Sequence, residues 1–233
     1  SVLEQVGDID CVIFNAGIGQ QSSASATSAE ETERLFRINA MAPIHWTQLL
    51  LKGKKPPKQL VITSSVASKF AVPLSASYAA SKHAVHAYFT TLAAEQPKLK
   101  ICLPCPGPVA TPLNDDKSAT DDDDNDDDSS KGKKKKKKES KMPAKRCARL
   151  MISSMIKGRD TGSHETWIAQ QPTLFFLYLH QHFPGVANWL LQTVLGPTRV
   201  AMWEAGLNVY DPASLGELRK MRREEAATAS KED

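Results

Sequence analysis

The chain has 233 residues, of which 41% are hydrophobic and 24% are charged, and its formal net charge is +4. This composition fits a soluble globular domain and excludes a wholly disordered, a collagen-like or a disulfide-stapled chain. The basic surplus is too small to indicate a protein dedicated to nucleic-acid binding.

Three short apolar runs in the first half of the chain have the character of buried strands. Their positions are residues 9–14, 59–63 and 99–103. Val, Ile and Leu dominate these runs, and such residues favour the extended geometry of a strand. Pro104 and Pro106 are expected to end the third strand, because proline cannot donate a backbone hydrogen bond.

Helices are predicted between these strands. Ser28 can cap a helix, with Glu31 three residues later, and Pro43 is expected to kink or restart that helix. Residues 76–95 contain neither proline nor glycine and predict a second helix. This alternation indicates right-handed crossovers and therefore an α/β fold with a Rossmann-type, doubly wound parallel sheet.

Residues 115–141 break this pattern with a run of aspartates followed by a run of lysines. The aspartates lie within 121–128 and the lysines within 133–138. Neither block can be buried, so we expect a solvated low-complexity insertion. A nuclear-localisation or nucleic-acid patch and a calcium site are the alternatives, although the aspartates lack the glycine of an EF-hand loop. After the insertion, residues 142–157 predict a helix and residues 165–169 a fourth strand.

The segment 172–195 is rich in leucine and aromatic residues. Histidine, glutamine, proline and asparagine interrupt it, so a membrane-spanning helix is not expected. We consider a peripheral contact with a membrane interface, a dimer or substrate-access surface, and a helix pair packed on the domain. The polar tail from Ser214 to Asp233 predicts an exposed helix.

Cys102 and Cys105 form a C-x-x-C pair near the end of the third strand. No second pair follows at the spacing of a zinc site, and four cysteines are too few to staple a secreted fold. We therefore expect reduced thiols at a strand end and no metal site, and a redox or metal pair is the alternative.

Tyr78 and Lys82 lie four residues apart and therefore share one face of the predicted helix 76–95. An ammonium near a phenol favours the phenolate and lowers the tyrosine pKa from its usual value of about 10. Such a tyrosine can be a general acid toward a carbonyl and a general base toward an alcohol. Ser65 follows the second strand, at the carboxyl edge of the sheet where open α/β sheets bind ligands. The serine hydroxyl can therefore return to the tyrosine.

Two further turns end strands at the same edge: Asn15-Ala16-Gly17 after the first strand and Pro106-Gly107-Pro108-Val109-Ala110-Thr111 after the third. Together with Asn39, Ser65 and Tyr78-x-x-x-Lys82, these turns resemble the short-chain dehydrogenase/reductase family in order and spacing. The resemblance covers about residues 8–113. Residues 145–150, residues 165–169 and the aromatic segment are similar, more loosely, to the family's microsomal branch. That branch includes 11-beta-hydroxysteroid dehydrogenase and the dehydrogenase/reductase member 7 proteins.

The resemblance implies a catalytic role for four residues. Tyr78 would supply or take the proton, and Ser65 would hydrogen-bond the substrate oxygen on which negative charge develops. Lys82 would also hold the ribose hydroxyls of the cofactor, and Asn39 would hold a relay water at the helix kink. A polar cap near Pro43 is the alternative role for Asn39.

The resemblance also implies a binding site for NADP or NAD. Besides Tyr78 and Lys82, the residues that would contact this cofactor belong to the two turns: Asn15, Ala16, Gly17, Pro106, Gly107, Val109 and Thr111. Asn15 and Gly17 would border the adenosine side, whereas Val109 and Thr111 would meet the nicotinamide amide. Pro106 and Gly107 would shape the turn.

The glycine-rich turn T-G-x-x-x-G-I-G, near which family members begin, is absent from the sequence. Gly17-Ile18-Gly19 lacks the third glycine of a dinucleotide-binding turn. We therefore expect a fragment, with the Rossmann-type sheet truncated at its N-terminus and the residue that separates NADP from NAD missing. The first strand would then be an unpaired apolar sheet edge, which is prone to aggregation.

These features predict five segments. They are 1–113, the C-terminal half of the Rossmann-type catalytic domain; 114–141, the insertion; 142–171, the last helix and strand of the catalytic domain; 172–210, the apolar aromatic segment; and 211–233, the polar tail. His83 and His86 match no family role and are expected to be surface or packing residues.

The predicted function is an NAD(P)-dependent oxidoreductase that interconverts an alcohol and a carbonyl on a small lipophilic substrate, such as a steroid, a retinoid or a fatty derivative. The alternative is a catalytically inactive remnant that acts as a binding or structural protein. We expect a location at the endoplasmic reticulum membrane or in the cytoplasm. Peripheral membrane contact through 172–195 and a homodimer are further expectations, whereas a nucleic-acid partner is not expected.

Overall fold

The computed structural model describes residues 8–110, 141–209, 211 and 213–232. Its main sheet has four parallel strands in the order β1-β2-β3-β6. The strands are β1 (Cys11–Phe14), β2 (Gln59–Ile62), β3 (Lys100–Pro106) and β6 (His164–Ile168). Gln59 pairs with Cys11 on one side and with Lys100 on the other, and Cys102 pairs with His164. The predicted parallel sheet is confirmed.

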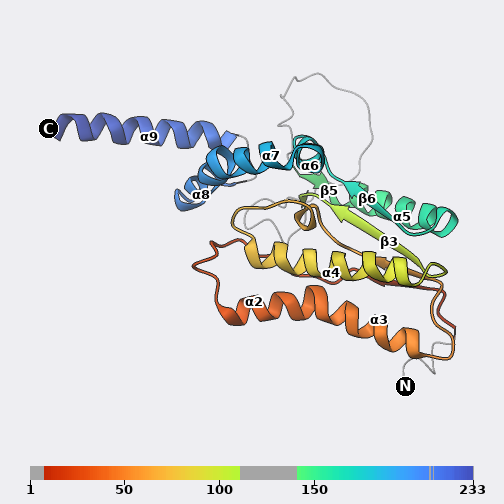
Figure 1. The fold of residues 1–233 in the computed structure, drawn as a ribbon. Coiled ribbons are helices and arrows are strands. Elements are labelled where there is room, and N and C mark those ends of the chain that lie inside the picture. Colours follow the sequence, from red (N-terminus) through yellow and green to blue (C-terminus); the bar gives the residue numbers. More distant parts are fainter. Residues whose placement is uncertain (1–7, 111–140, 210, 212, 233) are drawn as a thin grey trace, which may run out of the picture.

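Helices cover both faces of this sheet (Figure 1). The helices on one face are α2 (Ala29–Phe36), α3 (Ala42–Lys52) and α4 (Ala76–Glu95), and α5 (Ala144–Thr161) lies on the other. Between the sheet and the first layer lies an apolar core whose almost wholly buried members include Leu60, Ile62, Val85, Phe89 and Ile101. Burial of branched and aromatic side chains from both layers holds the helices on the sheet.

A π-helical turn (Arg37–Met41) joins α2 and α3 into one continuous helical segment. Ser28 caps α2 as predicted, because its hydroxyl accepts a hydrogen bond of 3.0 Å from Glu31 N. Pro43 lies in the first turn of α3, where a residue without a backbone N–H is tolerated. Asn39 lies in the π-helical turn, a geometry that is frequent at functional sites.

β3 continues through Pro104 and ends at Pro106, the second of the two prolines that were expected to end it. The Pro104 carbonyl accepts a hydrogen bond of 2.9 Å from Ser64 N, so the proline removes a donor but keeps its acceptor paired. The expectation that Pro104 ends the strand was therefore wrong, whereas Pro106 does end it.

A second, two-stranded parallel sheet follows β3. It consists of β4 (Val109–Ala110) and β5 (Met142–Pro143), with Val109 beside Met142. Strands of only two residues have no sequence pattern that predicts them, and these two were not expected. Thr111 and nearly all of the predicted insertion at 114–141 lie outside the described residues.

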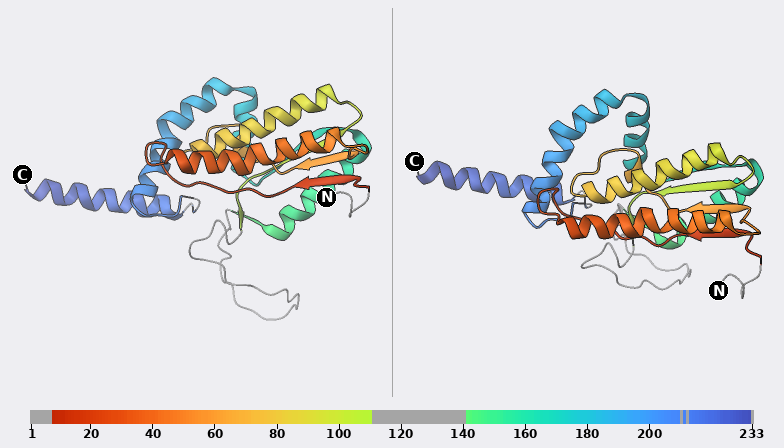
Figure 2. Two further views of the ribbon diagram at one scale, coloured as in Figure 1. Left: turned by 90° about the horizontal axis from the view of Figure 1, so that it is seen from below. Right: turned by 60° about the horizontal axis from the view of Figure 1, so that its bottom comes forward.

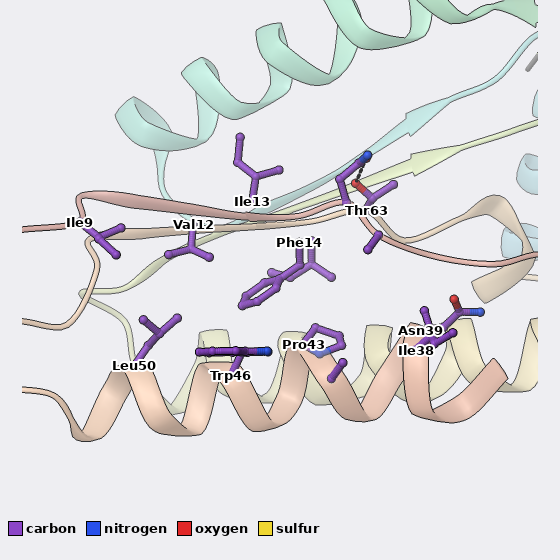
Figure 3. Close-up of a pocket in the computed structure, with 14 residues that line it drawn as sticks. Ile9, Val12, Ile13, Phe14, Ile38, Asn39, Pro43, Trp46, Leu50 and Thr63 are labelled. Carbon is purple, nitrogen blue, oxygen red and sulfur yellow. Dashed lines mark hydrogen bonds between the residues drawn. The ribbon is translucent and has the colours of Figure 1, made fainter. Parts of the chain in front are cut away.

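Among the described strands, β1 forms an edge of the main sheet, because its strand partner is β2 alone. An apolar groove of about 390 Å³ lies between β1 and α3 (Figure 3). Ile13 on β1 and Trp46 on α3 line this groove and are 55% and 53% exposed. The described part of the chain therefore has the open apolar edge that the sequence predicts.

The described residues of the C-terminal part are mainly helical. Its elements are α6 (Thr173–His182), α7 (Pro184–Leu190), a π-helical turn (Leu191–Leu195), α8 (Gly196–Glu204) and α9 (Ala213–Glu232). α9 extends away from the rest of the molecule in every view (Figures 1 and 2), as the expected exposed tail helix does. Within the described ranges, none of the helices has both the length and the apolar character needed to cross a membrane.

Large apolar side chains of α6 and α7 face solvent. Five of them are more than half exposed, and we call them the α6–α7 apolar surface: Phe175, Tyr178, Phe183, Val186 and Trp189. Tyr178 also contacts the sheet, because its ring packs edge-on against Trp167 of β6 at a centroid distance of 5.3 Å.

Candidate active site

The carboxyl ends of three neighbouring strands carry residues that the sequence singled out. Asn15 follows β1 directly, Ser65 lies three residues after β2, and Pro106 is the last residue of β3. Thr63 joins the first two strand ends: its N donates to Phe14 O at 2.9 Å, and its hydroxyl donates to Asn15 Oδ1 at 3.0 Å. The parallel sheet therefore gathers these residues at one edge, where α/β sheets bind ligands.

Ser65 caps a short 3₁₀ turn (Val66–Ser68) that follows β2. Its Oγ accepts a hydrogen bond of 3.1 Å from Ala67 N and donates to Pro106 O across 3.5 Å. A donor–acceptor distance of 3.5 Å marks a weak bond, which the hydroxyl can exchange for a better acceptor. Ser65 is therefore held by its turn, while its proton can be redirected.

Tyr78 and Lys82 lie in the first two turns of α4. The Lys82 ammonium is 5.9 Å from the centroid of the Tyr78 ring, within the range of a cation–π interaction. The same ammonium donates a hydrogen bond of 2.9 Å to Thr63 O, which connects α4 with the end of β2. Lys82 is 5% exposed, and this burial lowers the pKa of its ammonium to about 8.

Asn39 is buried and connects the turn after β1 with the helix that carries the tyrosine. Its Oδ1 accepts a hydrogen bond of 2.9 Å from Ile18 N, and its Nδ2 donates to Ile18 O at 3.0 Å. Nδ2 also lies 3.0 Å from Ser81 Oγ, which in turn donates to Tyr78 O at 2.7 Å. These bonds fix the position of the first turn of α4 relative to the β1 end.

Gly17 lies directly against both Asn39 and Lys82. A Cβ atom on Gly17 would be 3.2 Å from Asn39 Oδ1 and 3.4 Å from Lys82 Nζ. A side chain here would crowd two polar groups, which glycine avoids. Asn15 and Ala16 precede it and line the groove beside β1.

The turn after β3 is packed against the last strand. Gly107 N donates a hydrogen bond of 2.8 Å to Ile168 O, and a Cβ atom on Gly107 would lie only 2.9 Å from Ala169 Cβ. Pro106 offers its carbonyl to Ser65, and Val109 continues into β4. The structure brings these residues to the same edge as Ser65, whereas the position of Thr111 lies outside the described residues.

Gln20 holds the N-terminus of α4 and was not singled out from the sequence. Its Oε1 accepts a hydrogen bond of 3.0 Å from Tyr78 N, and its backbone carbonyl accepts one of 3.1 Å from Ser75 Oγ. Leu74, four residues before Tyr78, has a φ of 66°, which is uncommon for a residue other than glycine. A glutamine in a loop has no local pattern that predicts such a clamp.

The two histidines of α4 differ in their surroundings. His83 is exposed, in agreement with the expected surface position. His86 is 7% exposed, and its Nε2 lies 3.0 Å from Glu165 Oε2. His86 is therefore a buried residue in a charged cluster, which the sequence did not predict.

Cys102 and Cys105 lie within β3 as buried free thiols. Burial raises the pKa of both thiols, to about 12 for Cys105. A buried thiol of raised pKa is a poor nucleophile, which supports a structural role for the pair. The described residues contain no group of three metal-ligating side chains from His, Cys, Asp and Glu.

Comparisons with known proteins agree with this geometry. The family described as short chain dehydrogenase matches residues 1–122. The human protein named dehydrogenase/reductase SDR family member 7 is 31% identical over 213 residues, which are 89% of this chain and 60% of that protein. The mouse protein of the same name has the same identity and coverage. The chain thus spans about 60% of the length of these curated relatives.

Solved structures support the fold. An alcohol dehydrogenase from the archaeon Thermococcus sibiricus, complexed with 5-hydroxy-NADP, superposes with a TM-score of 0.59 at 23% identity and covers 73% of this chain and 68% of its own. A short chain dehydrogenase from Burkholderia cenocepacia, in complex with NADP, superposes with a TM-score of 0.60 at 16% identity and covers 82% and 71%. At these identities the likeness establishes the Rossmann-type architecture.

Proposed function

Because the chain belongs to the short-chain dehydrogenase family, we propose that it is an NAD(P)-dependent oxidoreductase that interconverts an alcohol and a carbonyl. The observation that carries this proposal is the position of the Lys82 ammonium. It lies beside the Tyr78 ring and donates to Thr63 O, two residues before Ser65. A proton donor, a charge that stabilises its conjugate base and a hydrogen-bonding hydroxyl therefore belong to one edge of the sheet.

In the reductive direction, the Tyr78 hydroxyl gives its proton to the carbonyl oxygen of the substrate. Ser65 Oγ donates a hydrogen bond to the same oxygen as negative charge develops on it. The Lys82 ammonium stabilises the phenolate that remains, and its burial strengthens this attraction because little water screens it. In the oxidative direction, the phenolate takes the proton of the alcohol. The nicotinamide, when bound, supplies or accepts the hydride.

Asn39 acts on this proton transfer from a distance. Its hydrogen bonds to Ile18 and Ser81 hold it between the β1 end and α4. We assign Asn39 the role of holding a relay water, through which protons reach Lys82 and Tyr78. The alternative role, a polar cap for the helix at Pro43, has less support, because both atoms of its amide group bond elsewhere.

Several residues fit the ribose and nicotinamide part of NADP or NAD. An ammonium has three donors, of which Thr63 O takes one, so Lys82 can also hold ribose hydroxyls. Gly17 keeps the backbone close to Lys82, as a cradle for a ligand requires. The turn Pro106–Val109 would border the nicotinamide, and Asn15 with Ala16 the adenosine side. The two solved relatives bound NADP or its 5-hydroxy derivative, which supports the same cofactor class.

The α6–α7 apolar surface supports a lipophilic substrate, such as a steroid, a retinoid or a fatty derivative. Its aromatic residues can lie at the depth of lipid headgroups, so the surface can make a peripheral contact with a membrane and collect the substrate there. The face of an endoplasmic reticulum membrane fits this contact. The same surface, paired with a second copy, would bury its aromatic residues in a homodimer.

One observation favours a second function, that of a catalytically inactive binding protein. β1 has an open apolar edge in the described sheet, which could bind another chain. Cofactor affinity separates the two functions, because only the enzyme requires the dinucleotide.

Titration of NADPH and NADH against the full chain, followed by nicotinamide fluorescence, tests the proposal. Lys82→Met removes the ammonium, whereas Lys98→Met changes an exposed lysine at the far end of the α4 crossover and is the matched control. Saturable binding that Lys82→Met weakens and Lys98→Met preserves supports the enzyme, together with turnover of a secondary alcohol. Absence of binding at millimolar cofactor supports the inactive protein.

A further inference from the structure

A charged cluster lies behind the Ser65 turn, outside the residues assigned above. Glu165 of β6 accepts from Lys69 Nζ at 2.6 Å, and its Oε2 also lies 3.0 Å from His86 Nε2. Lys69 Nζ and His86 Nε2 are themselves 2.7 Å apart. The three side chains, which we call the Glu165 cluster, come from three different elements: β6, α4 and the chain that follows the Ser65 turn.

The cluster is shielded from solvent. His86 is 7% exposed, and the side chains of Lys69 and Glu165 are 23% and 26% exposed. Burial raises the pKa of the Glu165 carboxyl, but hydrogen bonds from His86, Lys69 and Trp167 outweigh it and lower the pKa to about 2. Glu165 is therefore a carboxylate at neutral pH, and Lys69 balances its charge.

Hydrogen bonds lead from this cluster to the backbone of Ser65. His86 Nδ1 lies 3.2 Å from Ser64 Oγ and 3.4 Å from Ser68 Oγ. Ser68 Oγ donates to Ser65 O at 2.6 Å. The ring of His86 therefore contacts the residues on both sides of the turn, and His86 belongs to the same helix as Tyr78, two turns further along.

Glu165 also contacts the C-terminal helices through an aromatic pair. The indole N–H of Trp167 donates to Glu165 Oε1, and the Trp167 ring packs against Tyr178 of α6. Each oxygen of the carboxylate thus has a different partner, and Glu165 is the one member of the cluster that joins α4, the Ser65 turn and α6.

We propose that Glu165 is a positioning residue, which through Lys69 and His86 fixes the Ser65 turn against the Tyr78 helix. This inference rests on the proposed function, because its catalytic consequence requires Ser65 to meet the substrate oxygen. Without the carboxylate, Lys69 and His86 lose the charged group that contacts both of them, and the turn loses this connection to β6. The Ser65 hydroxyl then occupies several positions, so fewer molecules hold it where the substrate oxygen lies and kcat falls.

The first test measures hydrogen exchange in the full chain, with and without Glu165→Gln. The probes are the amides that close the turn, namely Ala67, Ser68 and Lys69, which donate to Ser65 Oγ, Ser65 O and Val66 O. We expect their exchange to accelerate about tenfold through local opening, while amides within β2 and β3 change little. Asp10→Asn removes an exposed ion pair of similar length, Lys58 to Asp10 at 2.7 Å, and is the matched control that should leave the turn unchanged.

Two further variants separate positioning from general stability. Lys69→Arg keeps the ion pair and should retain wild-type exchange in the turn. Lys69→Met combined with Glu165→Gln removes both charges, so it should regain thermal stability relative to Glu165→Gln but not the protection of Ser68. If Glu165→Gln does not fold, Lys69→Met alone serves as the variant, because it breaks the same ion pair from the other side.

The second test measures kinetics in the cofactor-bound chain. Glu165→Gln should lower kcat about tenfold, because the Ser65 turn is no longer held in place. It should leave the KM for the nicotinamide cofactor unchanged, because the Glu165 cluster is not part of the proposed cofactor site. Unchanged exchange in the turn, or acceleration that is uniform over all strands and follows the loss of global stability, would overturn the proposal. If the wild-type chain has no turnover, the proposed function fails, while the exchange experiment still decides whether Glu165 positions the turn.

Discussion

The Lys82 ammonium donates a hydrogen bond of 2.9 Å to the backbone carbonyl of Thr63, and so joins α4 to the strand that leads to Ser65. A buried ammonium needs such acceptors, since water cannot reach it. The contact therefore serves the fold and the chemistry together: it fixes the distance between α4 and β2, and it holds a positive charge near the Tyr78 ring.

Tyr78→Phe tests the proton donor. The substitution keeps the ring that packs near Lys82 and removes the hydroxyl, so turnover should fall about 10³-fold while cofactor affinity changes little. Steady-state kinetics and cofactor titration of the same preparation measure both quantities. Tyr88→Phe, on the same helix but packed against Phe89, is the control and should retain activity. Wild-type turnover in Tyr78→Phe would refute the assigned role.

The pKa of Lys82 predicts a pH dependence of stability. Burial lowers this pKa from 10.5 to about 8, so the folded state carries a buried charge below pH 8 at a cost in free energy. That cost decreases as the pH rises from 8 to 10.5, because the folded state releases its proton before the unfolded state does. The free energy of unfolding of wild type should therefore rise relative to Lys82→Met over this window, as urea titrations at several pH values can measure.

Glu165 predicts a dependence of the same sign at acidic pH. Its pKa is lowered from 4.5 to about 2, so its hydrogen bonds stabilise the folded state above pH 4.5 and are lost as the pH falls toward 2. The stability difference between wild type and Glu165→Gln should be constant at neutral pH and shrink across that interval. A difference that stays constant down to pH 2 would mean that the carboxylate is not held by these partners.

The sequence predicted the elements whose signals are local. Residues 76–95 lack proline and glycine, and α4 occupies that same range. Ser28 and Glu31 marked the start of α2 through a cap that involves only neighbouring residues. The candidate catalytic residues could be named from the sequence because the spacing of Tyr78 and Lys82 is a property of one helix, and Ser65 had only to follow a buried strand.

The features that were missed depend on residues far apart in the chain. Glu165 is 79 positions from His86 and 96 from Lys69, so no periodicity brings them together before the sheet order is known. The course of β3 through Pro104 depends on the hydrogen bond that Ser64 N donates to Pro104 O. Ser64 lies two residues after the end of β2, the neighbouring strand. Gln20 likewise clamps Tyr78 across the site, and its role follows only from the packed loop.

The exposed edge of β1 predicts self-association. Ile13 belongs to β1 and is 55% exposed. The outer edge of β1 has no strand partner in the described sheet. Ile13→Lys should raise the concentration at which aggregates form, and should change stability by less than about 0.5 kcal/mol because the side chain is already exposed. Ile152→Lys on α5, where the isoleucine is 53% exposed, controls for added charge alone. Light scattering over a concentration series distinguishes the two variants.

The α6–α7 apolar surface predicts binding to lipid. Phe183 and Trp189 are each 62% exposed, and their transfer from water into a headgroup region is favourable, since burial of apolar area contributes about 25 cal/mol per Å². Replacing both with serine should abolish sedimentation of the chain with phosphatidylcholine vesicles. Trp46→Ser removes an aromatic ring that is 53% exposed beside β1 and should leave sedimentation unchanged. A different outcome is possible: wild type does not sediment with vesicles and is a dimer in analytical ultracentrifugation, whereas the double variant is a monomer. In that case the surface is a dimer interface and does not bind membranes.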